Sequence, residues 1–144
     1  MKEPMELSVE ECLNLLAGEV FGRLAVVSPG GPRIIPVNYV LLDDAIVLRT
    51  SPYSELAQNA VDKDAAFEID DVDHTRQTGW SVVVVGRLEK VDPSDLADLH
   101  KVWVPQPWAG GQRNLYLQLR WREISGRRLR EAPGTTVPSR RRML

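Results

Sequence analysis

Residues 33–56 read RIIPVNYVLLDDAIVLRTSPYSEL, and this stretch decides the fold that the sequence predicts. β-Branched and aromatic residues on both sides of Asp43 and Asp44 favour strands, and paired aspartates are typical of a tight turn. We therefore expect a β-hairpin whose second strand ends in Arg49, Thr50, Ser51 and Ser54. A cation and hydroxyl groups before a helix start can receive an anion such as a phosphate. The simpler alternative is an arginine at a strand end followed by an ordinary Ser-Pro helix cap.

Outside this stretch, apolar residues gather in short segments separated by turn residues. Ser8 and Glu11 have the spacing of a capping box, which predicts a helix that ends near Gly18. Further helices are predicted for residues 54–61 and 92–103, and further strands for residues 22–28, 65–70, 80–91 and 114–124. The predicted fold is mainly β with short helices: a six-stranded, largely antiparallel barrel, closed or half open.

The segment WSVVVVGRLEKV, residues 80–91, has the strongest strand pattern in the chain. Four consecutive valines predict a central strand that is buried on both faces. Gly86 within this strand is typical of a bulge. The polar residues 71–79 that precede it are predicted to form a loop.

The composition is that of a soluble globular domain, with 144 residues of which 43% are hydrophobic and 26% charged. No apolar run approaches the roughly 20 residues of a membrane span. The acidic start has no signal-peptide pattern, and the single cysteine, Cys12, cannot form an intramolecular disulfide. These features favour a cytoplasmic protein that does not contact a membrane.

Charge is distributed unevenly along the chain. Residues 1–119 carry 10 Lys and Arg against 18 Asp and Glu, whereas residues 120–144 carry 8 Arg against 2 Glu. This pattern fits intramolecular or dimer contacts as readily as a nucleic-acid arm, and the last arginines lack the interleaved aromatic residues that nucleic-acid binding favours. We expect one domain over residues 1–131 and a disordered basic tail over residues 132–144.

Most common catalytic and metal-binding patterns are absent from the sequence. His74 and His100 are isolated, and neither CxxC nor HxxxH spacing occurs. The carboxylates around Asp70 lack the spacing of a calcium loop, so no metal site is predicted. GxSxG, GxGxxG and GxxxxGK[ST] motifs are also missing, and no catalytic residue can be assigned.

A flavin site remains possible, because the flavin itself carries the redox chemistry. Arg49, Thr50 and Ser54 could hold the phosphate of a flavin mononucleotide (FMN). The run Pro36, Val37, Asn38 and Tyr39 could supply backbone and amide groups to the ring edge. Trp80 or Trp108 could form part of a wall over the ring face. Trp103 and Trp108 could equally pack at an interface between subunits.

Several short motifs occur in a familiar order: GRLAV, PVNY, an Arg-Thr strand end, AFEID, GWSVVVVG and ISGRR. Over about residues 7–129 this order resembles the pyridoxamine 5′-phosphate oxidase-like proteins of the FMN-binding split-barrel superfamily, in the small branch common in actinobacteria. The resemblance implies a homodimeric oxidoreductase that holds FMN at the subunit interface and exchanges electrons with a small molecule that the sequence does not identify.

The resemblance also implies roles for individual residues. The strand from Pro36 to Tyr39 would lie along the isoalloxazine edge. Contacts to the phosphate would come from Arg49, Thr50 and Ser54. Trp80 and Ser81 would lie near the cofactor from the neighbouring strand.

One segment departs from the family pattern. Residues 53–55 read Tyr-Ser-Glu, where the family commonly has Gly-[Ser/Thr]-Lys. The Glu55 carboxylate would repel a nearby phosphate by roughly 1 kcal/mol unless it points away. The loop also lacks the histidine of nitroimidazole-reductase relatives, which argues against that activity. Two alternatives therefore stay open: a reductase that uses the deazaflavin F420 in the same groove, and a cofactor-free split-barrel dimer that acts as a binding or scaffold protein.

Overall fold

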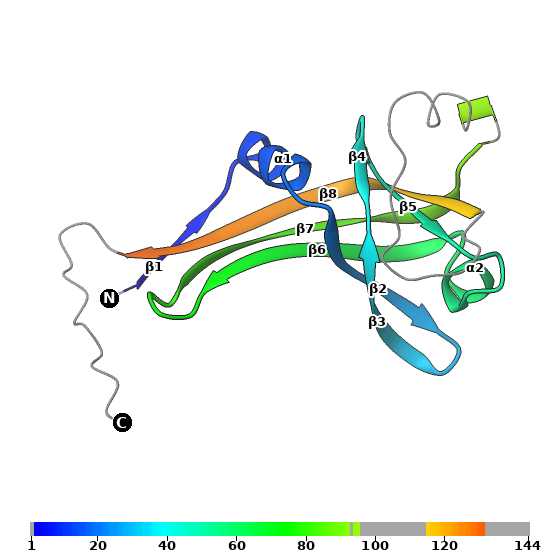
Figure 1. Cartoon of the computed structure of the whole chain (residues 1–144), viewed down its shortest axis with the longest axis horizontal. Helices are drawn as coiled ribbons and strands as arrows, with labels where there is room; N and C mark the ends of the chain where they lie inside the picture. Colours follow the sequence, from blue (N-terminus) through cyan, green and yellow to red (C-terminus); the bar gives the residue numbers. More distant parts are fainter. Residues whose placement is uncertain (1, 93, 96–114, 132–144) are drawn as a thin grey trace.

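The computed structural model describes residues 2–92, 94–95 and 115–131, which form one antiparallel sheet with two short helices packed on it (Figure 1). The strands are β1 (Lys2–Glu6), β2 (Phe21–Ser28), β3 (Gly31–Asn38), β4 (Val40–Leu42), β5 (Ala45–Thr50), β6 (Lys63–Asp73), β7 (Thr78–Lys90) and β8 (Leu115–Glu131). The helices are α1 (Val9–Ala17) and α2 (Glu55–Asn59).

The sheet has the order β3-β2-β6-β7-β8-β5-β4, and β1 pairs with β8 outside this path. It curves so that β3 also contacts β5, which makes a half-barrel. The predicted fold, mainly β and antiparallel, is therefore confirmed. The predicted helix of residues 92–103, both Trp103 and Trp108, and the tail of residues 132–144 lie largely or wholly outside the described residues.

Eight strands are described where six were predicted, for two reasons. The segment KEPME forms β1, which pairs with the last residues of β8 in a register that sets Lys2 opposite Glu131. The single strand expected before the Asp43 turn is divided at Tyr39 into β3 and β4. At that point the backbone N–H of Tyr39 donates to the carbonyl of Val20 at 3.0 Å.

The turn predicted at Asp43 and Asp44 is confirmed, and it joins β4 to β5. Asp43 has a φ of 50°, the left-handed conformation that aspartate tolerates in tight turns. The first half of the quoted stretch belongs to a different hairpin, because β3 pairs with β2 along its whole length. The hairpin around Asp43 and Asp44 is thus formed by β4 and β5 alone and is shorter than predicted, but its second strand still ends at Thr50.

The loop predicted for residues 71–79 is wrong. Strand β6 continues to Asp73 and β7 begins at Thr78, so a turn of four residues joins two long strands. The carboxylate of Asp73 stabilises this turn, since it accepts hydrogen bonds from the backbone N–H groups of Thr75 and Arg76, each at 3.0 Å. The end of β6 and the start of β7 carry polar residues on both faces, so the sequence there lacks the alternating pattern that predicts strands.

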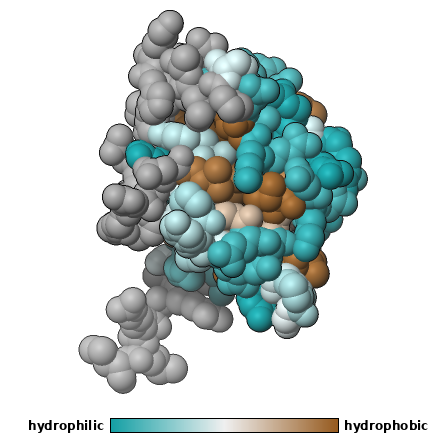
Figure 2. All heavy atoms as spheres, turned by 90° about the vertical axis from the view of Figure 1, so that its right-hand side faces the viewer, coloured by the Kyte–Doolittle hydropathy of each residue, from teal (hydrophilic) through white to brown (hydrophobic). Residues whose placement is uncertain are grey.

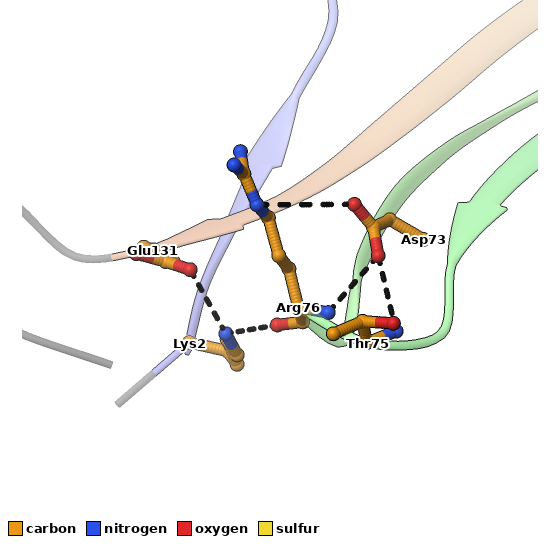
Figure 3. A network of polar contacts seen from close by, with 5 residues as sticks. All are labelled: Lys2, Asp73, Thr75, Arg76 and Glu131. Carbon is orange, nitrogen blue, oxygen red and sulfur yellow. Dashed lines mark hydrogen bonds and ion pairs between the residues drawn. The ribbon is translucent and has the colours of Figure 1, made fainter. Parts of the chain in front are cut away.

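The same turn is tied to the beginning and end of the described chain (Figure 3). The ammonium group of Lys2 donates to the backbone carbonyl of Arg76 and lies 3.6 Å from the carboxylate of Glu131. Strand β1 therefore joins the end of β8 to the β6–β7 turn.

Strand β7 lies at the centre of the sheet, as predicted, but only one of its faces is fully buried. Val82 and Val84 point into the core, whereas Val83 and Val85 are half-buried on the outer face. The pairing of β7 with β8 shifts register between Val85 and Gly86, so the predicted bulge is confirmed. A side chain at Gly86 would collide with the backbone carbonyl of Arg120, which explains the glycine.

The core lies between the inner face of the sheet and helix α1. Ser8 caps this helix with the predicted reciprocal bonds to Glu11. The Tyr39 ring packs edge-on against Phe67, with their centroids 4.8 Å apart. The largest fully buried side chains are Tyr39, Phe67, Leu16, Leu24, Ile46, Leu48, Ile69, Leu88, Leu117, Leu119, Val82 and Val84.

Candidate cofactor site

The hydroxyl groups at the end of β5 form one cluster with the start of α2. Thr50 Oγ1 donates to Ser54 Oγ at 2.9 Å, and Ser54 Oγ also accepts from the backbone N–H of Ala57 at 3.2 Å. Ser54 is thus the helix cap that the sequence predicted. Because its oxygen already accepts two hydrogen bonds, its own proton is available to an acceptor outside the protein. We call this end of the molecule, with Arg33, Thr50 and Ser54, the anion pole.

Arg49 does not join this cluster. Successive side chains of a strand point to opposite faces, so Arg49 and Thr50 leave β5 in opposite directions. Thr50 is buried, whereas the guanidinium of Arg49 lies over the ring of Tyr116, 5.5 Å from its centroid. The structure therefore brings two of the three predicted phosphate ligands together, and the third packs on the opposite face of the strand.

Arg33 is a cation at the anion pole that the sequence reasoning missed. Its Nε lies 3.5 Å from Glu55 Oε1, and both side chains are 45% exposed. Arg33 shares the inner face of β3 with Ile35 and Val37, which pack against the core. A charged residue at an inward position of this alternating pattern is the sequence feature that could have pointed to Arg33. Figure 2 faces this end of the molecule and shows apolar residues exposed between polar ones.

The predicted ring-edge residues run away from the anion pole along β3. Pro36, Val37 and Asn38 lie on this strand, which is an edge strand among those that the structure describes. The amide of Asn38 donates to the carbonyl of Val20 at 3.4 Å. β3 thus extends from Arg33 to Asn38 over about 17 Å.

Tyr39, the last residue of the predicted ring edge, has a buried side chain. Its hydroxyl donates to the backbone carbonyl of Leu16 at 2.6 Å, and burial raises the pKa of the phenol well above its ordinary value. The Tyr39 side chain therefore belongs to the core, and a cofactor contact from this residue would have to come from its backbone.

Trp80 and Ser81 lie at the opposite end of the sheet, on the first residues of β7. A groove of about 840 Å³ opens there, and Trp80 forms part of its wall. We call it the Trp80 groove. A smaller groove of about 530 Å³ shares much of this lining and includes Ser81. The smaller groove is lined by Asp70, Val72, Asp73, His74, Gln77, Thr78, Gly79, Trp80, Ser81, Arg127 and Leu129.

The anion pole and the Trp80 groove are far apart within one chain. Thr50 pairs with Leu115 at one end of β8, and Trp80 pairs with Arg128 near the other end. Thirteen residues of extended strand separate these positions, which corresponds to roughly 40 Å. Figure 1 shows α2 and the β6–β7 turn at opposite ends of the long strands. One copy of the chain therefore holds the predicted site residues in two separate groups, which do not meet within it.

A polar cluster lies on the outer face of the sheet between these two ends. Arg23 contacts Asp70 at 2.7 Å and Glu68 at 2.9 Å, so one guanidinium serves two carboxylates. Burial and the neighbouring Asp70 raise the pKa of Glu68. In the strand register Arg23 is opposite Pro36 and Asp70 is opposite Ser81, which sets the cluster between two predicted site positions.

Neither a metal site nor a membrane helix is found in the part of the chain that the structure describes. Within residues 2–92, 94–95 and 115–131, no three His, Cys, Asp or Glu side chains come together in a way that could hold a metal ion. The two described helices are too short to cross a membrane.

Comparisons with known proteins agree with this architecture. The family model described as pyridoxamine 5′-phosphate oxidase matches residues 8–128. The uncharacterized protein Rv0080 of Mycobacterium tuberculosis is 34% identical over 113 residues, which are 74% of this chain and 73% of that protein.

Solved structures are also similar to this chain. The FAD binding protein from Mycobacterium smegmatis has a TM-score of 0.70 and 26% identity, covering 89% of this chain and all (100%) of that one. A conserved protein of unknown function from Corynebacterium diphtheriae has a TM-score of 0.68 and 29% identity, covering 86% and 96%. The family model spans most of the sequence, and the chain therefore belongs to the pyridoxamine 5′-phosphate oxidase family.

Proposed function

We propose that this protein binds a flavin nucleotide in a site made by two copies of the chain, and that the bound flavin exchanges electrons with a small molecule. The observation that carries the proposal is the separation of the two groups of predicted residues, which would be the two half-sites. The anion pole offers a cation and hydroxyl groups but has no aromatic wall among the predicted residues that the structure describes. The Trp80 groove offers an aromatic wall and lies roughly 40 Å of strand away. A second copy would bring the missing half to each pole.

The donor set fits the parts of a flavin nucleotide. At the anion pole Arg33 and the Ser54 proton would hold a phosphate. The outer edge of β3, which pairs with no other described strand, would offer backbone groups to the polar edge of the ring, and Trp80 of the partner would cover the ring face. When bound, the flavin supplies the electron-transfer chemistry, and the protein's residues bind it, orient it and exclude water.

FMN is the cofactor that the sequence predicts, and F420 or FAD would present the same combination of ring and phosphate. The similarity to the FAD binding protein from Mycobacterium smegmatis supports the flavin class. The first test is a visible spectrum of the purified protein with and without added flavin. A flavin that binds is expected to show a shifted absorption band and quenched fluorescence. Absence of any binding at tens of micromolar would refute the proposal and favour a cofactor-free dimer.

Mixing two defective variants tests whether the site is shared. The double variant Arg33→Gln/Ser54→Ala damages the pole, and Trp80→Leu damages the groove while keeping an apolar side chain. Each variant alone is expected to bind flavin poorly. After subunit exchange, mixed dimers would contain one intact site each, so about a quarter of the sites should recover. If mixed dimers form and no sites recover, the site lies within a single copy.

A further inference from the structure

Glu55 gives the anion pole an unusual charge balance, and the inference that follows rests on the proposed function. Glu55 directly follows Ser54, and its Oε1 lies 3.5 Å from Arg33 Nε. The guanidinium of Arg33 is therefore already paired with a carboxylate. Arg49, the cation that the sequence predicted for this end, lies over Tyr116 on the opposite face of β5. The described pole thus combines one positive with one negative charge.

Such a pole distinguishes phosphates by their charge. A phosphate esterified on one side carries about −1.5 to −2 at pH 7, because its second pKa is about 6. A phosphate linked on both sides carries one charge and has no second ionisation. Coulomb repulsion from Glu55 grows with the charge of the phosphate group that lies beside it, and the second charge of that group must also lose water without gaining a further cation from the described residues of the pole. The extra charge of a monoester is therefore a disadvantage here.

We propose that Glu55 makes this pole select flavins or deazaflavins whose phosphate is linked on both sides, over the monoester FMN. Ser54 and Arg33 would still hold one phosphate oxygen each. Glu55 would act as the specificity-determining residue, since it limits the positive charge that Arg33 presents. F420 carries one such phosphate and FAD carries two, each with one charge, so the phosphate beside Glu55 is singly charged in either ligand and this chemistry admits both.

The test is a set of binding titrations with FMN, FAD, F420 and riboflavin, followed by fluorescence or absorbance. Wild type is expected to bind FAD or F420 more tightly than FMN. Glu55→Gln should lower the ratio of the FMN and FAD dissociation constants by roughly five-fold, mainly by tightening FMN. Riboflavin has no phosphate, so its affinity should stay the same. The FAD and F420 titrations show which of the two the pocket accepts.

Glu89→Gln is the matched control, because Glu89 pairs with Arg87 at 3.6 Å and is 47% exposed. This variant should leave the FMN to FAD ratio within about two-fold of wild type, as expected for an exposed ion pair that shares no residue with the pole. Circular dichroism of each variant verifies that the fold is retained.

A pH series gives an independent reading of the same contact. From pH 7.5 to 5.5 the FMN phosphate takes up a proton, whereas a doubly linked phosphate does not. In wild type, the affinity for FMN relative to that for FAD should therefore rise as the pH falls. In Glu55→Gln, this rise should be smaller. If FMN and FAD both bind and the ratio does not respond to Glu55→Gln, the inference is wrong and the proposed flavin site stands. If neither binds, both fail.

Discussion

Replacing Tyr39 by phenylalanine tests whether this residue belongs to the core. The change removes the hydroxyl that donates to the Leu16 carbonyl at 2.6 Å and keeps the ring against Phe67. Leu16 lies in the last turn of α1, where carbonyls have no partner within the helix, and it is fully buried. An unsatisfied buried carbonyl costs about 1–3 kcal/mol. We therefore expect Tyr39→Phe to lower the free energy of unfolding by about 2 kcal/mol.

Urea denaturation at neutral pH, followed by tryptophan fluorescence and far-UV circular dichroism, measures this loss. Tyr53→Phe is the matched control, because Tyr53 is 86% exposed. The control should change stability by less than about 0.5 kcal/mol. Both variants should keep the wild-type dependence on urea, so that only the midpoint moves. Equal stability of the two variants, within about 0.5 kcal/mol, would show that the Tyr39 hydroxyl does not anchor α1.

The pH dependence of the stability of wild type and of Tyr39→Phe gives a second measurement. Burial raises the pKa of Tyr39 in the folded state, whereas an unfolded tyrosine ionises near pH 10. Above pH 10 the unfolded state releases a proton that the folded state retains, so stability falls as the pH rises. The Tyr39→Phe variant lacks this term. The stability difference between wild type and the variant should therefore shrink by up to about 1.4 kcal/mol per pH unit above 10.

Three further predictions concern the sheet and helix α1. Gly86→Ala should destabilise the protein by about 2 kcal/mol or more, measured by urea denaturation, because the new methyl would collide with the Arg120 carbonyl. Ser8→Ala should cost about 1 kcal/mol in the same assay, since it removes the cap of α1. Cys12 is 1% exposed and burial raises its pKa, so a thiol reagent such as Ellman's reagent should label it only as fast as the native structure opens. Rapid labelling of the folded protein would contradict this.

The sequence predicted the fold well because its signals were local. Alternating apolar residues, the Asp43 turn, the Gly86 bulge and the Ser8 cap depend on neighbours within a few positions, and each was found where expected. Strand β1 was missed because KEPME carries charges and a proline in place of an alternating pattern. It is a strand because β8 offers it an edge, and the register of that pairing cannot be read from five residues.

The candidate site was less predictable because it depends on long-range geometry. Thr50 and Ser54 were grouped by the sequence and are in contact in the structure, since they are four residues apart and Ser54 caps the next helix. Arg49 and Thr50 were grouped by sequence, but alternation along a strand separates their side chains. The partnership of Arg33 with Glu55 joins residues 22 positions apart in the chain. Only the strand register shows that Trp80 lies at the far end of the sheet.

The separation of the two half-sites has a consequence for how the protein would respond to its own abundance. A ligand held jointly by two copies binds the assembled pair and not the single chain, so ligand binding and self-association stabilise each other. Dilution would then weaken flavin binding, and added flavin would counteract dilution by raising the fraction of paired chains. The level of expression would set how much of the protein carries cofactor, with no further regulator.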